Sequence, residues 1–363
     1  MIYTIFHWLQ TLPRRNFLSN LSTEETLSGV RCINKHSINI HYLLVSFLLF
    51  ATCLILSGCS EREVRMPFKI DSSETAFSFE TSNENNTALP FATNLAVPEG
   101  DVMPGEEIGD GADSYGSAIL VDSANANMMY SKNSLATLYP ASMTKVMTAI
   151  VAVKNASPDQ VFTADDSCVF TEGDVQKVGL KSGDTMTMDQ ALHLLLIYSA
   201  NDVAQLIAVN IAGSTEAFSD MMNSEAAALG ATNTHFVNPH GLQDENHYTT
   251  AYDMYLMFNE AVKYEEIVQV ISSPNYSTVY KHSDGSEASF SCDNTNRFLK
   301  GTAQAPGNIN VVGGKTGTTL AAGGCLVMLS KDSGGNDYIS CVMKGKTIDV
   351  TYGKTSSMLS LIK

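Results

Sequence analysis

Cysteine is scarce in this sequence and follows no metal-binding pattern. The 363 residues include seven cysteines, and none of them belongs to a Cys-x-x-Cys pair. The histidines show neither His-x-His nor His-Glu-x-x-His spacing. Because zinc sites in proteins are built from such closely spaced ligands, we expect no metal site and no cofactor.

Positive charge is also scarce. Lys and Arg number 22 against 38 Asp and Glu, which gives a net charge of -16 at pH 7. Proteins that bind nucleic acid need positive charge to neutralise phosphates. The composition therefore excludes nucleic acid as an expected partner.

The prominent apolar run near the N-terminus is short. It covers residues 42–57 without a charge, whereas a bilayer span needs about 20 residues. Four basic residues precede it: Arg14, Arg15, Arg31 and Lys35. A basic stretch, an apolar run and small residues at its end form the layout of a secretory signal.

The end of this run is more specific. Leu56-Ser57-Gly58-Cys59 resembles the lipobox of bacterial lipoproteins. The resemblance implies that residues 1–58 are a cleaved signal peptide and that Cys59 carries the lipid. The protein would then be anchored to the outer face of the cytoplasmic membrane of a bacterium. The alternative is an uncleaved membrane anchor over residues 42–57.

Residues 71–112 lack basic charge altogether. They contain acidic residues but neither Lys nor Arg, and they are rich in Ser, Thr, Asn, Gly and Pro without sustained periodicity. Such a composition cannot bury enough apolar surface to offset the entropy of ordering the chain. We therefore predict a disordered acidic tether over residues 59–112 and one folded domain over residues 113–363.

Strand and helix signals follow a definite order in the folded part. Apolar runs bounded by turn residues predict strands over 116–122, 128–131, 311–316, 325–330 and 338–344. Helical periodicity predicts helices over 142–154, 189–198, 201–209 and 214–229, with a closing helix over 352–362. Strands at both ends with helices between them indicate an α+β fold, in which one antiparallel sheet from the two termini is covered by helices.

One predicted helix carries a candidate nucleophile. Ser142-Met143-Thr144-Lys145 places a hydroxyl and an amine one helical turn apart, so that the side chains can touch. A serine needs a base to accept its proton, and a lysine can be that base if its pKa is lowered from about 10.4. The spacing alone is common by chance.

Two further patterns, taken one at a time, can each be explained by structure alone. Ser199-Ala200-Asn201 follows an apolar helix, where either polar residue could simply cap the next helix. Lys315-Thr316-Gly317 lies on a predicted strand after two glycines, where the lysine could simply be solvated. A lysine and threonine on an open strand can also bind a carboxylate, and the glycine lets a substrate backbone approach.

Together and in this order, the three patterns are the motifs of the penicillin-interacting serine hydrolases. The chain resembles the D-alanyl-D-alanine carboxypeptidase family, the low-molecular-mass penicillin-binding proteins. The likeness runs over residues 139–148, 199–202, 222–223, 229–230, 234–236, 238–242, 247–250, 253 and 314–317. It implies a β-lactamase/transpeptidase-like fold with a helical subdomain, and it makes residues 113–363 the catalytic domain.

The resemblance assigns roles in acyl transfer. Ser142 would attack the bond between two D-alanines of a peptidoglycan stem peptide, and Lys145 would take its proton. Ser199 would relay a proton to the leaving amine, and Asn201 would bind substrate and steady Lys145. Lys315 would supply a nearby cation that helps to keep Lys145 neutral.

The resemblance also assigns a substrate-binding strand. Thr316 and Thr319 are candidates for the terminal carboxylate, and Gly317 allows close approach. The N–H groups of Ser142 and Thr318 would hold the oxyanion. The expected partners are stem peptides ending in D-Ala-D-Ala and, as covalent inhibitors, β-lactam antibiotics.

Three alternatives stay open at this point. A β-lactamase shares the three motifs, but no Glu-x-x-x-Asn spacing occurs between Asn201 and Lys315. A penicillin-sensing lipoprotein would be acylated without turnover. A zinc-dependent D,D-carboxypeptidase would have to use His235, His240 and His247, whose spacing is unsuitable.

Two points are left undecided by the sequence. Arg297 lies near a family position linked to the substrate carboxylate, although the local alignment places Thr295 there. The mature chain keeps four cysteines whose pairing is undetermined: Cys168, Cys292, Cys325 and Cys341.

Overall fold

The computed structural model describes residues 95–98, 100–103, 114–171 and 173–363. The predicted signal peptide, the lipidation site at Cys59 and most of the predicted tether lie outside these residues. Within the described part, no helix is both long and apolar enough to cross a membrane.

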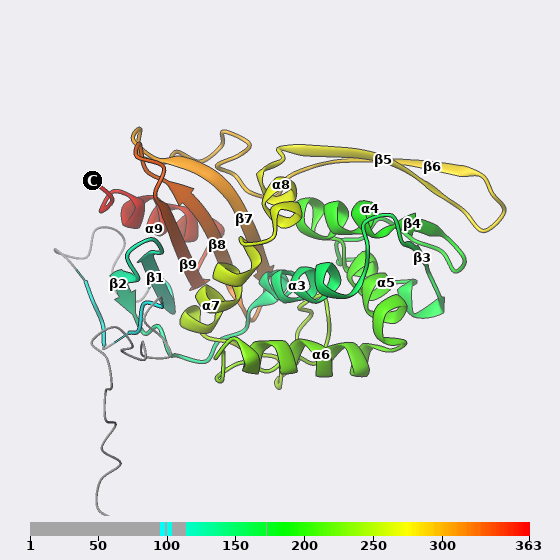
Figure 1. The fold of residues 1–363 in the computed structure, drawn as a ribbon, viewed down its shortest axis with the longest axis horizontal. Helices are drawn as coiled ribbons and strands as arrows, with labels where there is room; N and C mark the ends of the chain where they lie inside the picture. Colours follow the sequence, from blue (N-terminus) through cyan, green and yellow to red (C-terminus); the bar gives the residue numbers. More distant parts are fainter. Residues whose placement is uncertain (1–94, 99, 104–113, 172) are drawn as a thin grey trace, which may run out of the picture. The chain divides into compact units, whose positions relative to one another are not determined.

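A five-stranded antiparallel sheet is built from both ends of the folded part, as predicted (Figure 1). Its strands are β1 (Ser117–Asp122), β2 (Asn127–Lys132), β7 (Asn310–Thr319), β8 (Gly323–Lys331) and β9 (Asp337–Gly345). Their order in the sheet is β2-β1-β9-β8-β7. Strand β7 is therefore an edge strand, which leaves one side of its backbone without a neighbouring strand in this sheet.

The sheet is covered on both faces. On one face, Val327 and Leu329 of β8 belong to the large core that includes α3 (Lys145–Asn155). On the other face, Leu326 and Met328 pack in a smaller core with α9 (Ile348–Leu359). Because both faces are buried, the sequence of β8 is a nearly continuous apolar run rather than an alternation of apolar and polar residues.

The helical region surrounds α3, which contacts α5, α6 and α7 (Figure 1). Its helices are α4 (Met188–His193), η3 (Leu194–Tyr198), α5 (Asn201–Ala212), α6 (Thr215–Ala228), α7 (Ala251–Ala261) and α8 (Glu265–Ser272). The predicted ends of α6 are confirmed: the Ser214 side chain caps its first turn, and Gly230 follows its last turn at φ 81°. The predicted single helix over 189–198 is instead an α-helix that changes to a π-helix at Leu194.

A second, four-stranded sheet was not predicted. It has the order β3-β4-β5-β6, with β3 (Val161–Thr163), β4 (Thr185–Thr187), β5 (Asn275–Lys281) and β6 (Glu287–Asp293). Two of its strands have only three residues, too few for a periodic signal. Strands β5 and β6 extend beyond the helices as a long hairpin (Figure 1), and the chain that leaves β6 leads to Thr295 and Arg297.

Part of the predicted tether packs against the domain. Ala96 is 1% exposed within the main core. The backbone of Val102 exchanges two hydrogen bonds of 2.8 Å with Ser131 on edge strand β2, and the Asp101 carboxylate accepts from the backbone N–H of Asn133. The composition of the segment gave no sign of these contacts, because an edge strand offers backbone partners that composition does not reveal.

Candidate active site

Ser142 lies in a short 3₁₀ turn, η1 (Ala141–Thr144), that leads directly into α3. The sequence predicted an α-helix starting at Ser142, whereas α3 starts at Lys145. Ala141 has φ 48°, an uncommon backbone conformation for a residue other than glycine. The turn presents Ser142 at the surface and keeps its Oγ 3.0 Å from the Nζ of Lys145. The predicted serine–lysine contact is present.

Lys145 is fully buried, at 0% exposure. Its amine donates hydrogen bonds to Oδ1 of Asn201 at 2.8 Å and to the carbonyl oxygen of His240 at 2.6 Å. None of its three close partners is a carboxylate. Burial lowers the pKa of Lys145 well below its ordinary value, the neighbouring Lys315 lowers this pKa further, and Asp202 opposes both.

The second serine contacts the second lysine. Ser199 ends the π-helix at φ 70°, and its Oγ accepts a hydrogen bond of 2.9 Å from the amine of Lys315. That amine also donates to the carbonyl oxygen of Thr316 at 2.8 Å. Lys315 is 0% exposed, and burial lowers its pKa to about 7.

Gly317 brings β7 against the nucleophile. A Cβ atom at this position would lie 2.8 Å from the carbonyl oxygen of Pro140 and 3.0 Å from the backbone nitrogen of Ser142. The first distance is shorter than real Cβ contacts and the second is tighter than most of them, so a side chain would push the strand away from η1. The glycine of the third motif therefore sets the width of the site.

The motifs line one cleft with a volume of about 570 Å³. Its lining includes seven of the predicted site residues: Ser142, Ser199, Asn201, Thr316, Gly317, Thr318 and Thr319. Lys145 and Lys315 lie beneath this surface and contact its lining residues: Lys145 contacts Ser142 and Asn201, and Lys315 contacts Ser199 and Thr316. Both lysines therefore act from below the floor of the cleft.

The two predicted carboxylate-binding hydroxyls differ in their partners. The Thr316 hydroxyl donates to the Oγ1 of Thr295 at 2.7 Å, across the cleft wall. The Thr319 hydroxyl accepts from the backbone N–H of Ala322 at 3.0 Å, which ties it to the β7–β8 turn. Thr295 also lines the cleft.

Arg297 lines the same cleft and is held by α9. Its guanidinium forms an ion pair with Asp349 and lies over the ring of Tyr352, 5.4 Å from the centroid. Its backbone N–H donates to the Tyr352 hydroxyl at 2.9 Å. Among the described residues of the cleft lining, Arg297 is the only cation.

Sequence reasoning missed most of the cleft walls. One wall is formed by Asp174, Val175 and Gln176, and others come from residues 241–243 and from Ile348 and Tyr352 of α9. These are ordinary residue types in segments without a motif. The only signal was the position of residues 241 and 242 within the family likeness.

The histidines near the site form hydrogen bonds with neighbouring residues of the protein. The Nδ1 of His247 accepts from the backbone N–H of Val237 at 3.1 Å, and its Nε2 lies 2.7 Å from Oγ1 of Thr144. The Nδ1 of His240 accepts from the backbone N–H of Leu242 at 3.2 Å. Burial lowers the pKa of His240 to about 3 and that of His247 to about 4, so both rings are neutral.

Neither a metal centre nor a disulfide is present in the part of the chain that the structure describes. No group of three His, Cys, Asp or Glu residues there is placed to hold a metal ion. Cys168, Cys292, Cys325 and Cys341 are all free thiols, and Cys325 and Cys341 are buried in β8 and β9.

Comparisons with known proteins agree with this geometry. A family model described as D-alanyl-D-alanine carboxypeptidase matches residues 110–347. The chain is 36% identical over 220 residues to D-alanyl-D-alanine carboxypeptidase DacF of Bacillus subtilis, covering 59% of this chain and 54% of that protein. It is 31% identical over 251 residues to D-alanyl-D-alanine carboxypeptidase DacC of Escherichia coli, covering 67% of this chain and 59% of that protein.

Solved structures show the same fold. The Streptomyces K15 DD-transpeptidase superposes with a TM-score of 0.64 at 24% identity, covering 70% of this chain and 98% of that one. The predicted fold class is thereby confirmed. The match spans little more than half the length of the two carboxypeptidases, at 54% and 59%.

Proposed function

Because the chain belongs to the D-alanyl-D-alanine carboxypeptidase family, we propose that it removes the terminal D-alanine from peptidoglycan stem peptides through an acyl-enzyme on Ser142. The observation that carries the proposal is the contact between a cleft-lining serine and a buried amine without a carboxylate partner. Burial disfavours the charged form of an amine, so Lys145 can act as a base rather than as a fixed cation.

The partners of Lys145 orient it as a base. A neutral amine has two N–H donors and one lone pair, whereas Oδ1 of Asn201 and the carbonyl oxygen of His240 can only accept. Both hydrogens are therefore directed to these two oxygens. The lone pair is left for the third neighbour, the hydroxyl of Ser142 at 3.0 Å. The arrangement suits removal of the serine proton.

The reaction then has two steps. In acylation, the Oγ of Ser142 bonds to the carbonyl carbon between the two D-alanines, and its proton moves to Lys145. The C–N bond breaks, and the proton that Lys145 accepted passes to the departing amine with Ser199, which contacts Lys315, as the relay, so that Lys145 is neutral again. In deacylation, water adds to the ester, and the peptide leaves with a new carboxylate while Ser142 regains its proton.

Charge stabilisation comes from the two sides of the cleft. Gly317 holds β7 against the backbone nitrogen of Ser142, and this close approach supports the family assignment of an oxyanion site between Ser142 and Thr318. Thr316 and Arg297 line the cleft together and suit the terminal carboxylate of the substrate. A β-lactam, whose ring amide resembles the scissile bond, would acylate the same serine.

One assay separates this function from its alternatives. The purified protein is mixed with a peptide ending in Lys-D-Ala-D-Ala, and released D-alanine is measured beside the hydrolysis of penicillin. We expect D-alanine release, slow penicillin turnover and no effect of EDTA. Penicillin labelling without D-alanine release would indicate a sensor, and rapid penicillin hydrolysis a β-lactamase. Ser142→Ala is the control, and the mass of the penicillin-labelled peptide must include Ser142.

We also propose that the enzyme is a lipoprotein anchored at Cys59 on the outer face of the cytoplasmic membrane. The support is the lipobox-like sequence at residues 56–59 and the basic and apolar residues before it. The mass of the membrane-extracted protein tests this proposal. Retention of residues 1–58 would show that no such cleavage occurs.

A further inference from the structure

We propose that residues 174–180 are a positioning element for the second motif, with Asp202 anchoring the segment from inside and Gln176 fixing Ser199 from the cleft side. The inference rests on the proposed function, because it assigns how Ser199 and Asn201 are held for acyl transfer. Neither Gln176 nor Asp202 belongs to the three motifs that carry the chemistry.

Gln176 has hydrogen bonds on both sides of Ser199. Its side-chain Nε2 donates to the carbonyl oxygen of Tyr198 at 2.7 Å, one residue before the serine. Its own carbonyl oxygen accepts from the backbone N–H of Asn201 at 2.8 Å, two residues after the serine. The turn that presents Ser199 is thus held at both ends by one residue of the opposite wall.

The turn at Ser199 needs these hydrogen bonds because its backbone conformation is unfavourable. Ser199 has φ 70°, a conformation that is unfavourable for a residue other than glycine and persists only where the surroundings fix it. The preceding π-helix ends there, with the backbone N–H of Ala200 donating back to the carbonyl oxygen of Leu194 at 3.2 Å. Ser199 and Asn201 each hold one of the two lysines, so a shift of this turn would move both contacts.

Asp202 fixes the base of the segment. Its carboxylate is fully buried and accepts hydrogen bonds from the backbone N–H groups of Val178, Gly179 and Leu180 at 3.1, 2.7 and 3.1 Å. A buried carboxylate with several N–H donors is a rigid anchor. The cleft-side tip at Gln176 is therefore tied to the same helix that it positions.

Asp202 also brings the negative charge that acts on Lys145. The charged or titratable groups facing this amine are Lys315 from β7, Asp202 from α5, and His240 and His247 from the loop after α6. Both histidines are neutral, and Lys315 opposes a charge on Lys145. Asp202 is the group among them that favours it.

Two variants test the element, with a matched control. In Gln176→Ala we expect kcat/KM for D-alanine release and the rate of penicillin acylation to fall about fivefold, which is the effect of losing one hydrogen bond. The Tm should hardly change, because the amide is exposed. Gln190→Ala removes an amide that likewise donates to a backbone carbonyl, that of Val279 at 2.8 Å in the second sheet. It should lower Tm and leave both rates unchanged.

Asp202→Asn gives a readout that a purely structural role would not move. It removes the negative charge that raises the pKa of Lys145, so the ascending limb of the pH profile of acylation should move to lower pH. A folded Asp202→Asn with an unmoved limb, or one moved to higher pH, would overturn the role of Asp202. If this variant does not fold, the rate of Gln176→Ala decides.

The outcomes separate the inference from the proposed function. Wild-type rates in Gln176→Ala, or an equal loss in Gln190→Ala, would overturn the positioning role. If the wild type releases no D-alanine but is acylated by penicillin, the proposed function fails, and the acylation rates still test the positioning element.

Discussion

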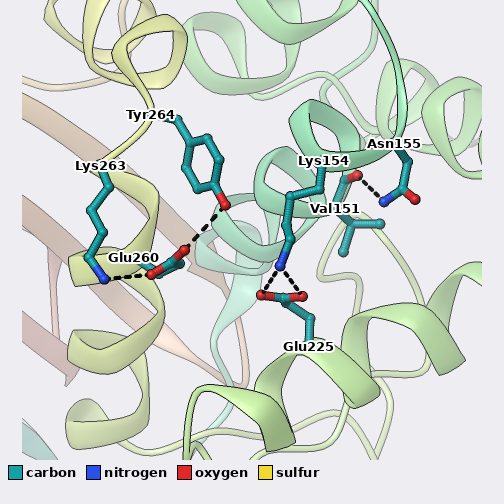
Figure 2. Close-up of polar contacts among 7 residues, drawn as sticks. All are labelled: Val151, Lys154, Asn155, Glu225, Glu260, Lys263 and Tyr264. Carbon is teal, nitrogen blue, oxygen red and sulfur yellow. Dashed lines mark hydrogen bonds and ion pairs between the residues drawn. The ribbon is translucent and has the colours of Figure 1, made fainter.

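Helix α3 carries two lysines whose environments are opposite. Lys145, at its first residue, is fully buried, has no carboxylate within contact, and has a lowered pKa. Lys154, in its last turn, has a side chain that is 40% exposed and donates to both carboxylate oxygens of Glu225 at 2.8 and 2.7 Å (Figure 2). The hydrogen bond to Glu225 raises the pKa of Lys154.

The difference shows what makes an amine a base. The same side chain on the same helix is a structural cation where a carboxylate and water can reach it. It becomes a proton acceptor where only neutral oxygens surround it. Lys263 lies just after α7 and, like Lys154, is a structural cation: it donates to Glu260 of that helix at 2.8 Å, beside Tyr264 (Figure 2).

Removal of the buried amine should have the largest effect. In Lys145→Ala we expect acylation by penicillin and D-alanine release to fall roughly 10²–10⁴-fold, because among the described residues Lys145 is the side chain whose amine contacts the Ser142 hydroxyl. Lys154→Ala is the matched control at the other end of the helix and should keep the wild-type rate. Similar losses in both variants would show that the comparison reflects helix stability rather than proton transfer.

The second buried lysine, Lys315, should make the free energy of unfolding depend on pH. The pKa of Lys315 is about 7 in the folded protein, whereas a lysine in the unfolded chain has a pKa of about 10.4. Between these values the unfolded state binds one more proton than the folded state, so stability rises with pH. Relative to Lys315→Met, the free energy of unfolding of the wild type should increase by roughly 1.4 kcal/mol per pH unit from pH 7.5 to 9.5.

Denaturant unfolding at several pH values measures this difference directly. The other titrating groups are common to both proteins and largely cancel in the comparison, although Lys145 also senses the loss of Lys315. A flat difference across this pH range would mean that Lys315 stays charged in the folded protein.

The reacting pairs were only partly encoded in local sequence. Ser142 and Lys145 are three residues apart, so helical geometry alone predicts their contact. Ser199 and Lys315 are 116 residues apart, and only the family resemblance brought them together. The depth of both lysines could not be predicted, because burial depends on how β7, α5 and the loop after α6 meet.

The same limit applies to the fold. The apolar runs of β8 and β9 predict strands of a buried sheet, and this prediction is confirmed. The three-residue strands β3 and β4 carry no periodic pattern, and the change to a π-helix at Leu194 leaves the apolar run intact. The wall residue Gln176 has no sequence signal at all, since its role depends on backbone atoms of Tyr198 and Asn201.

Arg297 is an intermediate case, a paired cation inside the cleft. It lies with Thr316 in the lining but is ion-paired to Asp349, whose side chain is 81% exposed. In Arg297→Ala we expect KM for the peptide to rise about tenfold with a smaller change in kcat, because a charge-assisted contact to the substrate carboxylate is lost. Asp349→Asn should lower KM by freeing the guanidinium. A KM that is unchanged in Arg297→Ala would leave Thr316 as the carboxylate contact.

The smallest effect is expected at the surface pair that completes the comparison. In Glu225→Gln the Lys154 amine keeps a hydrogen-bond acceptor on a side chain that is already 40% exposed, so the free energy of unfolding should fall by only about 0.2–1 kcal/mol. The loss should shrink further in high salt, since exposed charges are screened. Enzyme activity and its pH profile should match the wild type. A shift of the pH profile in Glu225→Gln would show that the two ends of α3 are electrostatically coupled. The contrast between its lysines would then not be a purely local effect of burial and nearby carboxylates.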